Sequence, residues 1–131
     1  MARVRSVGVA VYALDVDRVA AFYAAVLGLE VAERAEGYAV VRGEQCEVAV
    51  VAIPAAIAAG IEIADPPEVR ESTPLKPVLL VPSLDAADLV VRAGGALAPG
   101  ARPWEFGGLR RLDVVDPEGN VVQLAEVAAA D

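Results

Sequence analysis

The chain has 131 residues, with 11 basic and 19 acidic side chains and no histidine, so its formal net charge is −8. A chain of this length is expected to form a single domain, 1–131, because two separate domains would each have a marginal core. The negative charge repels phosphate backbones and the arginines are scattered, which excludes nucleic acid as a partner. The single cysteine, Cys46, has no partner for an internal disulfide, and a zinc site built on Cys or His is excluded.

A membrane-spanning segment is also excluded. The longest stretch without charge, residues 48–61, is only about 14 residues long and is interrupted by a proline and a glycine. The apolar run at 7–14 is followed by Asp15 and Asp17, where a signal peptide would require a small-residue cleavage site. We therefore expect a cytoplasmic protein that does not bind membranes.

The first half of the chain changes from a strand pattern to a helix pattern and back. Alternation over residues 7–14 predicts a strand. A helix is expected to follow, with Asp15 as its N-cap and Gly28 as its C-cap. Three further strands are expected at 30–34, 38–42 and 45–53.

The same order of elements returns in the second half. Residues 54–74 are rich in Pro and Ala and are predicted to be a connection, with a helical turn at 55–59. Ser83 is the expected N-cap of a second helix, which stops at the Gly94 and Gly95 pair. The expected strands are 77–81, 96–101, 109–115 and 120–127.

This repetition predicts an α+β fold class with two βαβββ modules. Module one is expected at about 3–53, the connection at 54–74 and module two at about 75–127. The halves share the order of their elements rather than their residues, so an α+β domain without internal symmetry is the alternative.

Two segments carry motifs typical of one protein family. Residues 113–124, DVVDPEGNVVQL, contain an Asp-Pro-x-Gly-Asn turn before the last strand, and residues 14–18 with 22–31 match the family's first helix. The chain thus resembles the vicinal oxygen chelate superfamily, which includes glyoxalase I, bleomycin resistance proteins, extradiol dioxygenases and methylmalonyl-CoA epimerase. The resemblance covers nearly the whole chain and implies a cupped mixed sheet. It also implies a homodimer, since exposed sheet edges need cover.

Members of this superfamily place four metal ligands, usually His, Glu, His and Glu, on strands of both modules. The corresponding positions of this chain are Gly8, Glu47, Lys76 and Gln123. Only Glu47 is a usual ligand, because glycine has no side chain, a protonated lysine repels a cation and a neutral amide binds divalent ions poorly. The resemblance therefore implies a protein without metal or other cofactor.

Lys76, the only lysine, suggests a replacement for the metal. We hypothesise that its ammonium faces Glu47 and Gln123, because a buried ammonium needs such partners. The alternative is a solvated strand end for Lys76, a surface carboxylate for Glu47 and an exposed amide for Gln123.

The large aromatic residues outside the first helix are predicted to line a ligand cavity, with core or dimer packing as the alternative; they are Trp104, Phe106, Tyr38 and Tyr12. Arg110 and Arg111 must point to opposite faces of their strand, so one of them can meet an anionic group. Arg110 is taken as the candidate.

Other reactive residues are given structural roles. Cys46 is expected to be a buried, inert thiol, because no histidine base is present and nearby glutamates oppose a thiolate. Asp113, Asp116 and Glu118 are interpreted as strand-end and turn residues. No catalytic residue is assigned.

The leading functional hypothesis is a metal-free, dimeric, glyoxalase-like protein that binds a small, partly aromatic or cationic molecule. It would act by sequestration, as bleomycin resistance proteins do, which would make it an antibiotic resistance protein. The alternative is a metal-dependent lyase, isomerase or dioxygenase of the same superfamily. A third possibility is an accessory protein whose surface binds another protein.

Overall fold

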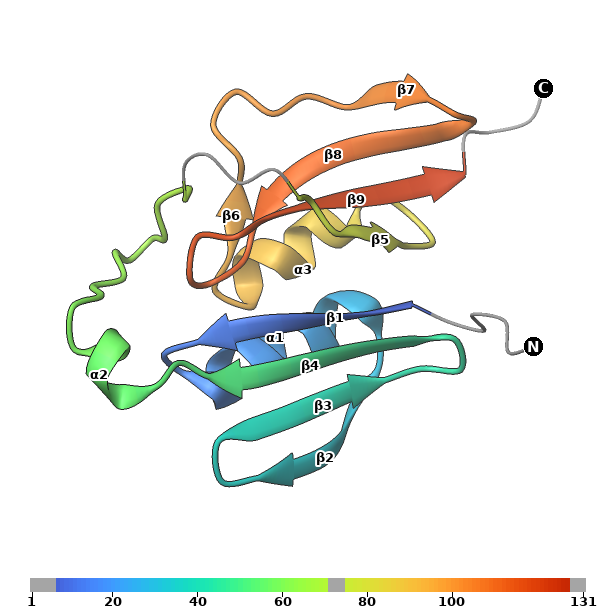
Figure 1. The fold of residues 1–131 in the computed structure, drawn as a ribbon. Coiled ribbons are helices and arrows are strands. Elements are labelled where there is room, and N and C mark those ends of the chain that lie inside the picture. The colour runs from blue at the N-terminus through green and yellow to red at the C-terminus, as the bar shows by residue number, and fades with distance from the viewer. Residues whose placement is uncertain (1–6, 71–74, 128–131) are drawn as a thin grey trace. The chain divides into compact units, whose positions relative to one another are not determined.

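The computed structural model describes residues 7–70 and 75–127. The chain divides into two compact units, Met1–Glu62 and Ile63–Asp131, each with its own sheet (Figure 1). Within the described ranges, every helix is too short or too polar to cross a membrane.

The first unit has a four-stranded sheet with one long helix on it (Figure 1). Its elements are β1 (Val7–Ala13), α1 (Val16–Leu27), β2 (Glu30–Ala35), β3 (Tyr38–Arg42), β4 (Cys46–Ala52) and the short α2 (Ala55–Ala58). The strand order is β1-β4-β3-β2, in which β1 and β4 are parallel and the other pairs antiparallel. The predicted βαβββ order is confirmed for this unit.

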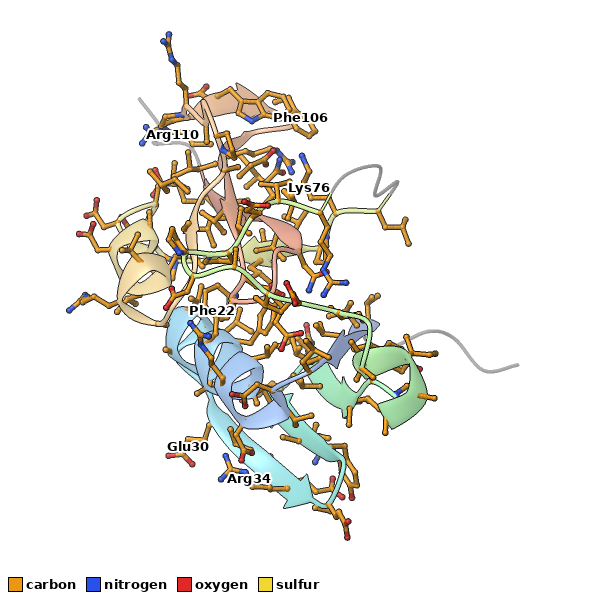
Figure 2. The ribbon with its side chains drawn as sticks, turned by 90° about the vertical axis from the view of Figure 1, so that its left-hand side faces the viewer. Phe22, Glu30, Arg34, Lys76, Phe106 and Arg110 are labelled. Carbon is orange, nitrogen blue, oxygen red and sulfur yellow. The ribbon has the colours of Figure 1, made fainter. Side chains whose placement is uncertain are left out.

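Helix α1 begins and ends at the predicted caps. The Asp15 carboxylate accepts a hydrogen bond from the backbone N–H of Arg18 at 3.0 Å, and Gly28 has the left-handed φ of 66° that closes the helix. Phe22 and Tyr23 are fully buried, with their rings edge to face at 5.0 Å. Figure 2 labels Phe22 on this helix. The helix thus covers one face of the sheet and leaves the other face for a site.

The second unit repeats this plan with one added strand. Its elements are β5 (Val78–Leu80), α3 (Ala86–Arg92), β6 (Ala96–Leu97), β7 (Trp104–Phe106), β8 (Leu109–Val115) and β9 (Val121–Val127). The order β5-β9-β8-β6 corresponds to β1-β4-β3-β2, and β7 pairs with β8 beside this path. Two mixed sheets of repeated topology confirm the α+β fold class.

The start of the second helix was predicted wrongly. Ser83 does not cap α3; its hydroxyl accepts from Asp85 N–H at 3.0 Å within the preceding turn, and α3 begins at Ala86. The carboxylate of Glu126 instead accepts from the backbone N–H of Leu84 at 2.8 Å. A side chain from a strand 42 residues away fills the role that the sequence pattern gave to a local serine.

The strand expected at 96–101 was also too long. Only Ala96–Leu97 pair with β8, and the chain leaves the sheet before Gly100. It returns as Trp104–Phe106, a strand that the sequence did not predict. Three residues between a proline and two glycines are too few for a periodic signal.

The turn before the last strand, residues 116–120, has the conformation that its Asp-Pro-x-Gly-Asn motif predicts. Asp116 is buried and accepts from the N–H groups of Glu118 and Asn120 at 2.9 and 3.0 Å. Gly119 has φ of 93°, and its carbonyl accepts from the N–H of Arg70 at 2.9 Å. The turn interpretation of Asp116 and Glu118 is therefore confirmed.

Candidate functional site

The sheet face opposite α1 carries the predicted site residues of the first unit. Strand register places Tyr12 and Tyr38 on either side of Val51, and it places Glu47 between Gly8 and Arg42. Alternate residues of a strand share a face, so these side chains lie on the face that α1 leaves open. The structure thus brings Tyr12, Tyr38 and Glu47 to one surface.

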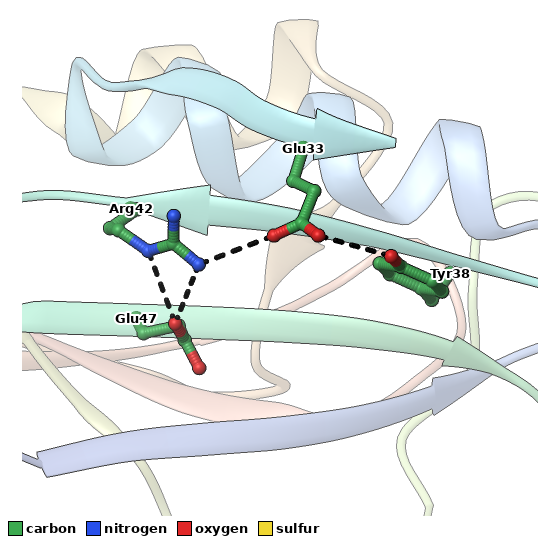
Figure 3. Close-up of polar contacts among 4 residues, drawn as sticks. All are labelled: Glu33, Tyr38, Arg42 and Glu47. Carbon is green, nitrogen blue, oxygen red and sulfur yellow. Dashed lines mark hydrogen bonds and ion pairs between the residues drawn. The ribbon is translucent and has the colours of Figure 1, made fainter. Parts of the chain in front are cut away.

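Glu47 belongs to a polar cluster on that face (Figure 3). Arg42 donates to one Glu47 oxygen through both Nε and Nη2, at 3.2 and 3.1 Å. The same Nη2 lies 3.4 Å from Glu33, whose other oxygen accepts from the Tyr38 hydroxyl at 3.1 Å. One guanidinium therefore joins two carboxylates, and one carboxylate joins the guanidinium to a phenol.

These contacts shift two pKa values. Its hydrogen bond to Glu47 raises the pKa of Arg42, against a smaller lowering by desolvation, so the guanidinium stays charged. The hydrogen bond and charge of Glu33 raise the pKa of Tyr38 above 10.0, because they favour the protonated phenol. The cluster holds two negative charges and one positive charge, which makes this face acidic.

The sheet of the second unit also has one open face. The buried Leu112, Val114, Val122 and Leu124 lie on the side that α3 covers. The residues that alternate with these along the strands, together with Lys76, lie on the opposite face. They are Lys76, Val78, Leu80, Trp104, Phe106, Arg111, Asp113, Gln123 and Ala125. Four predicted site residues, Lys76, Trp104, Phe106 and Gln123, are therefore brought together here.

A continuous polar network crosses this face from Lys76 to Arg111. The Lys76 ammonium lies 2.6 Å from Oδ2 of Asp113, and Oδ1 of Asp113 accepts from Nε2 of Gln123 at 3.0 Å. Oε1 of Gln123 accepts from Nη1 of Arg111 at 2.8 Å. Gln123 is only 4% exposed, so the alternative of an exposed amide is wrong. The Lys76 and Glu47 side chains are 41% and 47% exposed, in agreement with the alternatives of a solvated lysine and a surface carboxylate. The described carboxylate partner of Lys76 is Asp113, which lies within β8 rather than at a strand end.

The network ends at an aromatic pair. The guanidinium carbon of Arg111 lies 3.6 Å from the centre of the Phe106 ring, and Nε donates to the Phe106 carbonyl at 3.3 Å. The Phe106 and Trp104 rings are tilted by 31° with their centres 4.7 Å apart. Trp104 and Phe106 are 48% and 49% exposed, so a flat apolar molecule can reach both rings.

Arg110 lies on the other face. It donates to Glu126 at 2.7 Å, next to the chain that enters α3. Figure 2 labels Arg110 together with Lys76 and Phe106. Arg111, not Arg110, is therefore the member of this pair that joins the predicted site residues.

Three residues of these polar clusters were not predicted as site residues from the sequence. Glu33 and Arg42 gave no motif signal, because their strands are paired through a β-bulge whose register the sequence does not reveal. Asp113 was assigned to a strand end, although it is the cross-strand partner of Gln123. Cys46, expected to be buried, is exposed.

A separate hollow of about 520 Å³ lies at the N-terminal end of α1. It is lined by Leu14, Asp15, Val16, Asp17, Ala35, Glu36, Gly37 and Ala52. None of the predicted site residues lines it, and we assign it no role.

Each unit is thus a mixed sheet with a helix on one face and polar and aromatic side chains on the other. Residues 8–125 match the model of the glyoxalase-like domain. The chain therefore belongs to the glyoxalase-like domain family. A comparison with curated proteins finds no match.

Solved structures share the fold at low sequence identity. A glyoxalase/bleomycin resistance protein/dioxygenase family enzyme from Burkholderia phytofirmans PsJN has a TM-score of 0.66 at 21% identity, over 92% of this chain and 96% of that one. A glyoxalase/bleomycin resistance protein from Albidiferax ferrireducens T118 has 0.63 at 17%, over 91% and 95%. The bleomycin resistance determinant encoded on transposon Tn5 has 0.61 at 19%, over 95% and 98%.

The residues at the four superfamily ligand positions do not fit a divalent cation. A Cβ at Gly8 would lie 3.1 Å from the Glu47 carbonyl oxygen, so even the start of a side chain would be crowded there. Glu47 is paired with Arg42, Lys76 is a cation, and the Gln123 oxygen already accepts from Arg111. Among the described residues, no three Cys, Asp or Glu side chains are grouped as metal ligands.

Proposed function

We propose that this glyoxalase-like protein is a metal-free binding protein that encloses a small, partly aromatic or cationic molecule and acts by sequestration. The observation that carries this proposal is the half-exposed Trp104 and Phe106 pair, in which the Arg111 guanidinium lies against the Phe106 ring. Two large aromatic side chains held side by side at a sheet surface offer a flat ligand apolar area with little loss of side-chain entropy.

A cationic ligand has a different support. The face opposite α1 carries Glu33 and Glu47 with one arginine between them, and the whole chain has a net charge of −8. A negative field raises the local concentration of cations. Cationic antibiotics are therefore included among the candidate ligands.

The metal-dependent lyase, isomerase or dioxygenase is the weaker candidate. Its chemistry needs several oxygen or nitrogen ligands on one ion, and the four positions supply one carboxylate that an arginine already binds. No described contact favours this reaction class over binding.

The binding proposal can be tested with the protein's own fluorescence. Trp104 is the only tryptophan, so its emission reports directly on a ligand at this surface. The purified protein is titrated with a cationic glycopeptide antibiotic such as bleomycin and with planar aromatic compounds, in parallel with calorimetry. We expect quenching or a spectral shift with saturable heat for at least one compound. No signal in either measurement across the panel would refute the proposal.

A variant locates the site. Phe106→Ala leaves Trp104 in place as the reporter and is expected to weaken binding by about tenfold, the value of one aromatic contact. Val91→Ala, on the exposed surface of α3, serves as the matched control and should bind as the unaltered chain does. Equal weakening in both variants would argue against a site at Phe106.

We further propose that the chain is a homodimer. Strands β1, β2 and β5 are edges of their sheets, and the exposed side chains there include Val7 and Leu80. Sedimentation equilibrium at micromolar concentration should give about twice the chain mass of 13.5 kDa. A species of single-chain mass would contradict this proposal.

A further inference from the structure

Arg111 is a buried cation whose partners among the described residues are all neutral. The residue is only 9% exposed, and it contacts the Gln123 amide oxygen, the Phe106 carbonyl and the Phe106 ring. None of the ion pairs between described residues involves Arg111. Its neighbour Arg110, which is more exposed, does pair with a carboxylate. The more deeply buried of two adjacent guanidinium groups is therefore the one that pairs with no carboxylate in the part of the chain that the structure describes.

The hydrogen bonds that Arg111 donates to described residues go to neutral acceptors and none to a carboxylate. Removing a guanidinium from water is repaid only when charged or well-aligned polar groups replace the water. Two neutral acceptors and one aromatic face compensate part of the loss, whereas a carboxylate would compensate more because its hydrogen bonds to arginine are charge-assisted.

The carboxylate of this network, Asp113, is joined to Arg111 through the side-chain amide of Gln123. The amide points Nε2 at Asp113 and Oε1 at Arg111, so it separates the two charges. The other oxygen of Asp113 binds Lys76 at 2.6 Å. Within residues 75–127 this face therefore carries two cations and one anion, an excess of one positive charge among them in a protein that is acidic overall.

The excess charge lies beside the aromatic pair. Arg111 is the cross-strand partner of Trp104 and stacks on Phe106. A ligand whose ring lies against these two side chains would bring any substituent on its edge close to the guanidinium. The planar fork of arginine matches a carboxylate or a similar oxyanion.

We propose that Arg111 binds the anionic group of a planar aromatic ligand whose ring rests on Trp104 and Phe106. This inference rests on the proposed binding function and narrows its ligand class to aromatic anions at this face. Gln123 acts as a positioning residue, because it holds the guanidinium and keeps Asp113 from neutralising it.

Three compounds with the same ring system test the inference. Naphthalene-2-carboxylate, naphthalene-2-carboxamide and naphthalen-2-ylmethylammonium are titrated into the intact protein by calorimetry at fixed ionic strength. The carboxylate is expected to bind at least about tenfold more tightly than the amide, as one charge-assisted contact provides, and the ammonium compound more weakly than either. Equal affinities for carboxylate and amide in the unaltered protein would overturn the inference.

Adjacent arginine variants supply the matched control. Arg111→Gln should abolish the preference for the carboxylate, whereas Arg110→Gln, on the opposite face of the same strand, should retain it. An equal loss of the carboxylate preference in both variants would show a general charge effect and overturn the assignment to Arg111. Thermal melting of each variant checks that it is folded, and the ligand series on the unaltered chain decides the question if Arg111→Gln is not.

The outcomes separate this inference from the proposed function. Binding of all three compounds with similar affinity supports the aromatic surface and rejects the anion site. A preference for the ammonium compound supports the cationic reading of the proposed function and also rejects the anion site. If none of the three binds while another panel ligand does, the inference fails alone; if no compound binds at all, both fail.

Discussion

Arg42 places two donor atoms on one oxygen of Glu47, Nη2 at 3.1 Å and Nε at 3.2 Å. Glu47 is the single conventional metal ligand among the four superfamily positions, and its negative charge is already matched by this arginine. The carboxylate on which a metal site would depend is thus part of an ion pair, and the remaining positions offer a glycine, a cation and an engaged amide.

Added metal is therefore expected to have little effect on stability. Millimolar Mn²⁺, Ni²⁺ or Zn²⁺ should change the melting temperature by less than about 1 °C, because only an ion that binds the folded state stabilises it. Calorimetry measures the shift, and elemental analysis of the purified protein measures retained metal. Stoichiometric metal, or a rise of several degrees that Glu47→Gln removes, would contradict the donor-set argument.

Glu33 controls the ionisation of Tyr38. Because the carboxylate favours the protonated phenol, the pKa of Tyr38 is raised above 10.0 in the folded chain. The linked stabilisation is fully present below pH 10, the unfolded value, and is lost as pH rises through the higher folded pKa. Glu33→Gln should lower the pKa of Tyr38, which carbon NMR of labelled tyrosine measures. Tyr38→Phe identifies the resonance, because its signal is the one that disappears, and an unchanged pKa in Glu33→Gln would refute the role of Glu33.

Gln123 is expected to be important for stability. Gln123→Leu would leave Arg111 and Asp113 without the amide that joins them, at a cost of about 1–3 kcal/mol in the free energy of unfolding. Val127→Ala, on the same strand and 80% exposed, should cost less than about 0.5 kcal/mol. Urea denaturation measures both, and a Gln123→Leu chain as stable as the control would mean that water replaces the amide.

Gly119 tests the contact between the turn and the preceding connection. A Cβ at this position would collide with the carbonyl oxygen of Glu68, and the backbone is left-handed with φ of 93°. Gly119→Ala should therefore destabilise the chain by more than the 1–2 kcal/mol that is typical of a left-handed alanine. Gly100 also has a left-handed φ, of 69°, but a Cβ there would have no neighbour within 4 Å. Gly100→Ala therefore measures the loss of unfolding free energy that the backbone conformation alone causes. An equal loss of unfolding free energy in the two variants, measured by urea denaturation, would show that residues 68–70 move aside without penalty.

Local signals explain which elements the sequence predicted correctly. Asp15 and Gly28 bound α1 because capping involves backbone groups within a few residues. The Asp116 turn is likewise closed by its own neighbours. Where a distant strand supplied the contact, as with Glu126 at Leu84, the expected helix start was wrong by two residues.

The candidate site was predicted in its residue types but not in its contacts. The Lys76 ammonium was expected to face Glu47 and Gln123; its described carboxylate partner is Asp113, which was interpreted as a strand-end residue and which joins Lys76 to Gln123. Because adjacent residues of a strand point to opposite faces, the sequence shows that Arg110 and Arg111 lie on different faces of the sheet. It does not show which of the two faces carries the site. That depended on which side of the sheet α3 covers.

The sequence by itself determined the repeated βαβββ order, the family and the residue types at the four superfamily ligand positions, because caps, turns and residue types are local properties of the chain. Only the tertiary structure decided that Arg42 pairs with Glu47, that Gln123 stands between Arg111 and Asp113, and that buried Arg111 has no carboxylate partner among the described residues. Those relations depend on strand register and on the side of each sheet that its helix covers. Both are set by packing between residues far apart in the sequence.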